Sequence, residues 1–187
     1  DWIKYDRSNS ILSRHSVTSI LIDDSGYKWI GTAGGGLLKF NDRDWTKINT
    51  IESPLPNFNI TSIATESDGT AWIGTAGGGV TEFNGTQWKI HTSHNLGLPS
   101  DNITTIRIDE NDCKWIGTRS GLSKYDGSVL TTYKASQPGY YFGSTRSLVI
   151  DSIGNKWFVP ENGGLAQYDG KDITVYLPTN SGLPHTG

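Results

Sequence analysis

Seven residues in the second half of the chain combine aromatic rings with guanidinium, carboxylate and amide groups. Aromatic faces beside such polar groups are the chemistry that holds a polar, ring-shaped ligand such as an oligosaccharide. A contact with another blade, domain or copy and simple sequence drift are the two alternatives. The candidate ligand-binding residues are Arg119, Tyr140, Tyr141, Phe142, Arg146, Glu161 and Asn162.

The other chemically capable residues form no catalytic or metal-binding pattern. Cys113 is the single cysteine, so it cannot form an internal disulfide, and no Cys/His spacing matches a metal site. His15, His94 and His185 have no second ligand at a suitable spacing. The TAGGG runs precede neither a helix nor a GK[ST] motif, which argues against a phosphate site. We therefore expect no catalytic residue, no metal and no cofactor.

Composition favours an aromatic-rich, turn-dense β protein. The 187 residues include 23 Gly, 7 Trp, 8 Tyr and 5 Phe, with 34% hydrophobic residues. The net charge is -3, from 16 Lys+Arg and 19 Asp+Glu, so the chain lacks the basic field that a nucleic-acid partner requires. No apolar run approaches the roughly 18 residues of a membrane span. Membrane attachment would need regions outside these residues.

An internal repeat organises the whole chain. Trp29, Trp72, Trp115 and Trp157 open similar segments such as WIGTAGGGLLKF and WIGTRSGLSKY, at spacings of 43, 43 and 42 residues. Two further columns keep the same register, one upstream and one downstream of these tryptophans. They are Ile20, Ile63, Ile106 and Leu148, and Phe40, Phe83, Tyr125 and Tyr168.

Each repeat predicts four short strands. An alternating first strand such as VTSILI precedes an acidic turn, the WIGT strand follows, and the third and fourth strands come after a Gly-rich link and a second turn. Units of about 40–45 residues with four strands are typical of propeller blades. The sequence therefore predicts an all-β fold, a β-propeller array of four four-stranded blades. We interpret the recurring acids as turn formers; they are Asp23, Glu66, Asp109 and Asp151. We interpret all seven tryptophans as packing between blades, in the column given above and in a second column that lies in the fourth strands, Trp2, Trp45 and Trp88.

The predicted blades leave a surplus at each end. DWIKYD at the start is already an outermost strand, and GLPHTG at the end begins the lead-in to another blade. We expect a segment of a larger propeller. Four blades could also close alone as a small ring, or two copies could close together; we favour association, with remaining blades or a second copy on the open faces. The expected ranges are 1–8 for the outer strand of a preceding blade, 9–51, 52–94, 95–136 and 137–179 for blades 1 to 4, and 180–187 for the next lead-in.

The candidate residues lie where the fourth repeat departs from the others. Tyr140 and Tyr141 replace the Leu-Pro that precedes other first strands, and Arg146 replaces threonine. Glu161 and Asn162 lie in VPENGG, which replaces the GTAGGG link. The lead-in and the link between the second and third strands emerge at the same end of a four-stranded blade. We therefore expect the candidate residues to share one face.

The motifs WIGTAGGGLLKFN and GLPSDNIT, with the spacing of acidic turn and tryptophan, resemble two-component regulator propeller repeats over nearly the whole chain. The resemblance implies the sensor part of a membrane-bound hybrid two-component regulator, on the periplasmic or extracellular side. Such a module is non-catalytic and binds a glycan or another extracytoplasmic ligand. The alternatives are a propeller hydrolase or lyase acting on polysaccharide, for which Glu161 with Tyr141 is the best pair, and a pure assembly module.

Overall fold

The computed structural model describes residues 2–12, 16–48, 54–133 and 143–184, and these contain sixteen β-strands and no helix. The strands form four antiparallel sheets of four strands each, in chain order within every sheet. The predicted all-β fold of four four-stranded blades is therefore confirmed. Blade 1 comprises β1 (Val17–Ile22), β2 (Lys28–Thr32), β3 (Gly36–Phe40) and β4 (Trp45–Lys47); blade 2 β5 (Ile60–Thr65), β6 (Ala71–Thr75), β7 (Val80–Phe83) and β8 (Trp88–His91); blade 3 β9 (Ile103–Ile108), β10 (Lys114–Thr118), β11 (Gly121–Tyr125) and β12 (Leu130–Tyr133); blade 4 β13 (Thr145–Ile150), β14 (Lys156–Pro160), β15 (Leu165–Tyr168) and β16 (Ile173–Tyr176).

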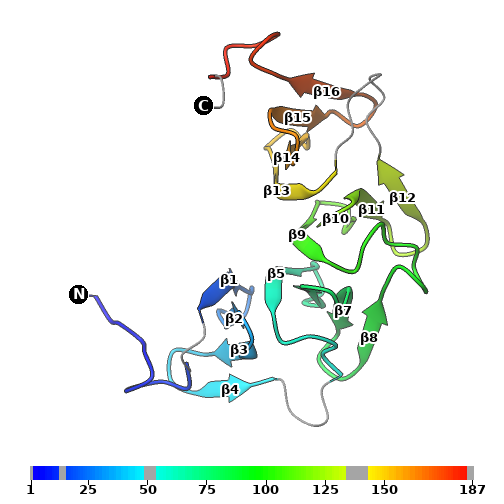
Figure 1. Cartoon of the computed structure of the whole chain (residues 1–187). Helices are drawn as coiled ribbons and strands as arrows, with labels where there is room; N and C mark the ends of the chain where they lie inside the picture. Colours follow the sequence, from blue (N-terminus) through cyan, green and yellow to red (C-terminus); the bar gives the residue numbers. More distant parts are fainter. Residues whose placement is uncertain (1, 13–15, 49–53, 134–142, 185–187) are drawn as a thin grey trace.

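The four blades follow one another around an arc that does not close on itself (Figure 1). The first strands β1, β5, β9 and β13 line the inner edge of the arc, and the fourth strands lie toward its outside (Figure 1). Each blade consequently packs its sheet face on the next blade. One face of blade 1 and one face of blade 4 meet no further blade within the described residues.

The hydrophobic core lies between the blades. Trp29 of blade 1 packs with Ile60 and Ile63 of blade 2, and Trp72 of blade 2 packs with Ile103 and Ile106 of blade 3. A third cluster joins Trp115 to Leu148 and Phe158 of blade 4. The alternation of apolar residues along each first strand produces this arrangement, because successive side chains point to opposite faces of the sheet.

Glycine in the second strand allows the close approach of neighbouring blades. A Cβ atom at Gly31 would lie 2.6 Å from Cγ2 of Ile60, and one at Gly74 would lie 2.6 Å from Cγ2 of Ile103. Neither distance is compatible with a non-bonded contact between carbons. The glycine of WIGT therefore lets the first strand of one blade lie directly on the second strand of the preceding blade.

The recurring acids hold the tryptophans as well as the turns. Asp109 Oδ1 accepts hydrogen bonds from the backbone N–H groups of Asn111 and Cys113, and its Oδ2 accepts one from Trp115 Nε1 at 2.8 Å. Equivalent indole bonds join Trp29 to Asp23 and Trp157 to Asp151, at 2.8 and 2.9 Å. These acids are turn formers, as predicted, and they also satisfy the indole N–H groups.

The first strands each contain a register shift, which places one extra residue near their start. The shift lies between Val17 and Ser19 in β1, and between Thr145 and Ser147 in β13. The extra residue in β1 is Thr18, whose hydroxyl donates a 2.6 Å hydrogen bond to the carbonyl of Ile60 in the next blade. Bulges of this kind redirect a side chain, and here they direct it toward the neighbouring blade.

Residues 2–12 form no strand, but their hydrogen bonds repeat those that follow β8 and β16. Asn9 accepts from the N–H of Asp6 and donates to the carbonyl of Lys4, just as Asn95 accepts from Thr92 and donates to Ile90. Asn180 does the same with Leu177 and Val175. Tyr5 contacts Phe40 edge-on at 5.2 Å. This segment therefore occupies the outer edge of a preceding blade position; the individual blade ranges stay a prediction.

One prediction for this segment is wrong. Trp2 was placed in a packed column with Trp45 and Trp88, which stack on Phe40 and Phe83 at 4.3 and 4.0 Å. Trp2 itself is fully exposed. The reason is physical, since no strand of a preceding blade lies beside it within the described residues.

Candidate functional site

The links that carry the candidate residues converge on one edge of the array. Gly34 and Gly36 donate backbone hydrogen bonds to the carbonyl of Phe58, just ahead of β5, at 3.1 and 3.0 Å. Arg119 N donates to the carbonyl of Asn102, just ahead of β9, at 3.0 Å. These hydrogen bonds join the link between the second and third strands of a blade to a lead-in, that of the next blade for Gly34 and Gly36 and that of the same blade for Arg119. Both kinds of segment were expected to emerge at the same end of a blade.

Glycine is required in two of these links. Gly79 has φ +77° and a Cβ there would lie 2.2 Å from the carbonyl oxygen of His91; at Gly164, with φ +80°, it would lie 2.5 Å from that of Tyr176. The chain can reverse this tightly beside the fourth strand only without a side chain. Blade 4 therefore keeps the glycine that shapes its link while it changes the residues around it.

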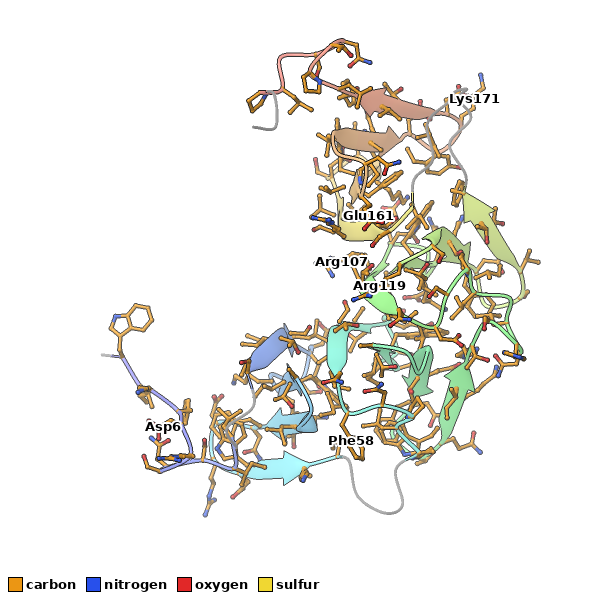
Figure 2. The ribbon with its side chains drawn as sticks, in the orientation of Figure 1. Asp6, Phe58, Arg107, Arg119, Glu161 and Lys171 are labelled. Carbon is orange, nitrogen blue, oxygen red and sulfur yellow. The ribbon has the colours of Figure 1, made fainter. Side chains whose placement is uncertain are left out.

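Four of the seven candidate residues lie in the described part of the chain. Arg119 in the β10–β11 link, and Glu161 and Asn162 in the β14–β15 link, are exposed, as is Arg146 in β13. Figure 2 shows Arg119 and Glu161 on adjacent blades, toward the inner side of the arc. Tyr140, Tyr141 and Phe142 lie outside the described residues.

Glu161 joins its link to the start of β13. Its Oε2 accepts a hydrogen bond from the backbone N–H of Ser144, at 3.4 Å. Arg146 lies two residues further along this chain segment. This hydrogen bond joins the β14–β15 link, which carries Glu161, to the segment that leads into β13, which carries Arg146. The carboxylate and the guanidinium group therefore come from two connected segments of blade 4.

Arg146 takes the place of the threonine at the bulge of the first strand. Thr104 in this position of blade 3 donates to the carbonyl of Thr145 in blade 4, as Thr18 does to Ile60, whereas the Thr61 hydroxyl has no hydrogen-bond partner. The Arg146 side chain is too long to repeat that short contact. It presents a cation at a position that elsewhere helps to join blades.

A hollow of ≈ 380 Å³ adjoins the β14–β15 link. Asn162 supplies an amide at this hollow, and most of its wall is apolar. In ligand pockets, apolar walls bury the ligand and a few polar groups fix its orientation. Its principal lining residues are Val159, Asn162, Leu165, Leu177, Leu183 and Pro184.

Sequence reasoning missed Arg107, which extends from β9 to the inner side of the arc (Figure 2). A second hollow, of ≈ 300 Å³, lies there against β1, β5 and β9. Arg107 is exposed, and its Nη1 donates a 2.7 Å hydrogen bond to the carbonyl of Ile106. The signal was present, because Leu21, Ala64 and Val149 occupy the same column in the other blades. A charge in an otherwise apolar column marks the inner edge of blade 3.

The acids of the turn column are unsuited to acid–base catalysis. Burial would raise the pKa of Asp109, but hydrogen bonds from Trp115 and from two backbone N–H groups, with Lys156 nearby, lower it overall. The pKa of Asp23 is lowered in the same way, by Trp29, the Tyr27 N–H and Lys39 against the effect of burial. These carboxylates are held ionised and are engaged in structural hydrogen bonds.

His91 lies at the same repeat position as Tyr133 and Tyr176, and like a core residue it is used for packing. It is 3% exposed, its ring stacks on Trp72 at 5.0 Å, and its Nε2 lies 2.7 Å from Glu82 Oε2. Burial lowers the pKa of His91 even though Glu82 acts to raise it. The imidazole fills the space between blades 2 and 3 rather than a ligand site.

Within the described ranges, no group of three or more His, Cys, Asp and Glu residues could hold a metal ion. The same part of the chain has no helix long and apolar enough to cross a membrane. The free Cys113 is buried.

The fold is similar to that of the extracellular domains of two proteins from B. thetaiotaomicron. The extracellular domain of a protein described as the hybrid two-component system BT3049 of B. thetaiotaomicron superposes with a TM-score of 0.78, at 23% identity over 96% of this chain and 25% of its own. The extracellular domain of BT4673 from the same organism gives a TM-score of 0.73, at 21% identity over 93% of this chain and 23% of its own. The chain thus spans about a quarter of these two structures.

The same fold occurs in an enzyme. A catalytically inactive virginiamycin B lyase from Staphylococcus aureus, solved with quinupristin, gives a TM-score of 0.70, at 20% identity over 88% of this chain and 57% of its own. No protein-family model and no curated protein matches the sequence. The TM-scores show a shared fold, which occurs both in these extracellular domains and in a lyase.

Proposed function

We propose that this chain is a non-catalytic, ligand-sensing propeller module of a two-component sensor or regulator, located on the periplasmic or extracellular side of a bacterial membrane. The observation that carries the proposal is the concentration of sequence departures on one edge of blades 3 and 4. Arg119 and Glu161 lie there on links of a rigid scaffold, with Arg146 and Asn162 on adjoining segments. Loops held by a rigid scaffold are the usual place for recognition residues.

The chemistry of this edge fits a polar ligand with several hydroxyl or acidic groups. A guanidinium group donates paired hydrogen bonds, a carboxylate accepts them, and an amide does both. A glycan fragment presents such donors and acceptors around a ring that aromatic side chains can cover. Tyr140, Tyr141 and Phe142, which precede Ser144 in the sequence, are the aromatic residues that we propose for this role.

The fold likeness to extracellular domains of the systems BT3049 and BT4673 supports the sensor reading and the extracytoplasmic location. In such a role the ligand would stabilise one association geometry of the receptor over another, since a ligand shifts an equilibrium only by binding its states differently. The partner that receives the signal would be a domain outside these residues.

A binding titration against a panel of oligosaccharide fragments, followed by calorimetry, tests the proposal. We expect the wild type to bind at least one fragment and the double variant Arg119→Ala with Glu161→Ala to lose most of that affinity, about ten-fold or more because two charge-assisted contacts are removed. Arg43→Ala removes an exposed arginine from the turn after β3 and is the matched control. Equal affinity of both variants would contradict the site.

A propeller lyase or hydrolase is the second candidate, favoured by the fold likeness to virginiamycin B lyase. The same titration separates the two functions when the fragments are recovered and analysed by mass spectrometry. A sensor leaves the fragments unchanged, whereas an enzyme converts them to products. Conversion that Glu161→Gln abolishes would replace the sensor proposal with an enzymatic one.

A further inference from the structure

Arg107 carries a positive charge on the inner side of the arc that no acidic residue neutralises. It takes part in none of the ion pairs among the described residues. The lysines between blades, by contrast, reach acids of the preceding blade: Lys114 Nζ lies 3.1 Å from Glu66 Oε1, and Lys156 Nζ lies 3.4 Å from Asp109 Oδ2. The cations that hold this scaffold together are thus paired, whereas Arg107 is not.

The packing of the repeat does not require a cation at this position. Blades 1 and 2 place Leu21 and Ala64 here, and both belong to hydrophobic clusters between blades. Arg107 lies opposite Trp115 in its sheet, just as Leu21 lies opposite Trp29. Because an apolar residue fulfils the structural role in these blades, the guanidinium group of blade 3 points to a different role.

The guanidinium group of Arg107 is held beside its own strand. Its Nη1 donates a 2.7 Å hydrogen bond to the carbonyl of Ile106, and the N–H of Ile106 donates a 2.9 Å hydrogen bond to Ser62 Oγ of the preceding blade. The side chain is therefore anchored at the inner edge, where Figure 2 shows it. The remaining N–H groups of the guanidinium can bind both oxygens of a carboxylate in the paired geometry typical of arginine.

The hollow of ≈ 300 Å³ against β1, β5 and β9 includes Arg107 in its wall. Ser19 and Thr65 contribute hydroxyl groups to the same wall, and none of its described lining residues is acidic. Most of the other lining residues are apolar, among them Ile20 and Ile106. Ligand pockets span about 300–1,000 Å³, so this hollow is of a size for a small ligand such as one sugar unit.

The backbone of the three strands adds further polar groups to the hollow. Within the described sheets, β1, β5 and β9 are each first in their sheet and pair with a neighbour on one side only. The opposite edge of each strand lies on the inner side of the arc (Figure 1). Backbone N–H and C=O groups along these edges are strong hydrogen-bonding groups, and they suit the hydroxyl groups of a sugar.

This hollow is separate from the links that carry Arg119 and Glu161. Arg119 N donates to the carbonyl of Asn102, directly ahead of the first residue of β9, Ile103. Arg107 lies four residues further along this strand, which corresponds to about 13 Å at the rise of an extended chain. The two groups of residues therefore lie at different levels of blade 3.

We propose that the hollow beside Arg107 is a second ligand site, which binds a sugar unit bearing a carboxylate group. Arg107 binds the carboxylate, the hydroxyls of Ser19 and Thr65 bind hydroxyl groups of the ring, and the isoleucines of the wall cover its apolar faces. Since the whole chain has a net charge of -3, the preference for an acid comes from this local contact and not from the overall field.

Calorimetric titration with three small probes tests the ligand class. We expect glucuronate to bind and glucose, which has the same ring without the carboxylate, to bind at least about ten-fold more weakly. Acetate should also bind more weakly than glucuronate, because it has the carboxylate but no ring for the hydroxyls and the apolar wall. Glucose binding as strongly as glucuronate would overturn the role of the carboxylate, and acetate binding as strongly would overturn the role of the sugar ring.

The variant Arg107→Leu tests the place of binding, because it restores the residue that blade 1 carries in this column. We expect it to bind glucuronate at least about ten-fold more weakly and to keep the melting temperature of the wild type, since leucine already fulfils the packing role in blade 1. A structural role for Arg107 would instead lower the melting temperature. Arg43→Leu removes an exposed arginine from a turn and is the matched control, which should bind as the wild type does.

The double variant Arg119→Ala with Glu161→Ala separates this site from the sensor proposal. It should bind glucuronate with the affinity of the wild type, because the links lie away from the hollow. Failure of the wild type to bind glucuronate, or equal affinity of Arg107→Leu and the wild type, would overturn the proposal. A loss of glucuronate binding in the double variant alone would place the acid at the links, which overturns this second site and leaves the sensor proposal standing.

Discussion

Blades 2 and 4 derive from the same repeat, yet they meet their surroundings differently. Blade 2 is packed on both faces, and its Trp72 and Ile73 are 1% and 0% exposed. Blade 4 packs one face on blade 3, while its other face retains Trp157 but carries Val159 in place of glycine. The comparison teaches that an equivalent position of the repeat, here that of the tryptophan, keeps its residue type, whereas its burial depends on the blades beside it: Trp72 is enclosed between two described blades and Trp157 is only partly buried.

The largest expected effect is a loss of stability when the repeated tryptophan is removed, and this loss should differ between blades 2 and 4. Trp72→Ala should lower the free energy of unfolding by about 3–5 kcal/mol, because it empties a fully buried site between two blades. Trp157→Ala should cost clearly less, since that indole is only partly buried and packs on a single blade. Urea denaturation followed by circular dichroism measures both. Equal losses would mean that the open face of blade 4 is as well packed as an interior interface.

A pH-dependent effect of intermediate size comes from His91 in blade 2. Burial lowers its folded pKa below the usual 6.5, although Glu82 acts in the opposite sense. The unfolded chain therefore binds more protons as the pH falls below about 6.5, and the stabilising contribution of neutral His91 is present above that pH and lost toward the folded pKa.

His91→Tyr is the matched variant, because Tyr133 and Tyr176 occupy the same column in blades 3 and 4. The difference in unfolding free energy between pH 7 and pH 5.5 should be smaller in this variant than in the wild type. Denaturation curves at the two pH values provide the comparison. An unchanged difference would show that the acid sensitivity comes from the carboxylates of the turns instead.

The smallest effect is expected at the candidate site. Glu161→Ala with Tyr141→Ala should change stability by no more than about 0.5 kcal/mol, because Glu161 is exposed in the β14–β15 link and the sequence places Tyr141 in the lead-in to the fourth repeat. Thermal unfolding measures the change. Unfolding of the double variant would show that this edge is structural, which would remove it as a ligand site.

The sequence predicted much of the fold because a repeat reports the same packing several times. The columns of Trp72 and Ile63 identified the strands and the faces that become buried. The position of Trp2 was predicted wrongly, since a column indicates which residues are equivalent but not whether a neighbour is present. The buried pair of Lys114 and Glu66 was missed because its partners lie on different blades.

The candidate site was harder to predict for a related reason. Its residues were found as departures from the repeat, and such departures show where a local requirement acts without showing what it is. Val159 also departs from glycine, in the same blade as Glu161. Only the structure shows why glycine is used at this position in other blades, because a Cβ at Gly31 or Gly74 would lie 2.6 Å from an isoleucine of the next blade. Arg107 was not predicted because it lies on the inner strand β9, whereas the predicted departures from the repeat were in the links and in the fourth repeat.

The most direct test of the sensor function is to map ligand binding onto the chain. Backbone amide shifts recorded by nuclear magnetic resonance during titration with a binding oligosaccharide fragment should change around Arg119, Ser144 and Glu161 and leave the turn at Arg43 unaffected. The fragment should be recovered intact. Changes confined to other blades, or conversion of the fragment during the titration, would contradict a non-catalytic sensor that binds its ligand at the edge of blades 3 and 4.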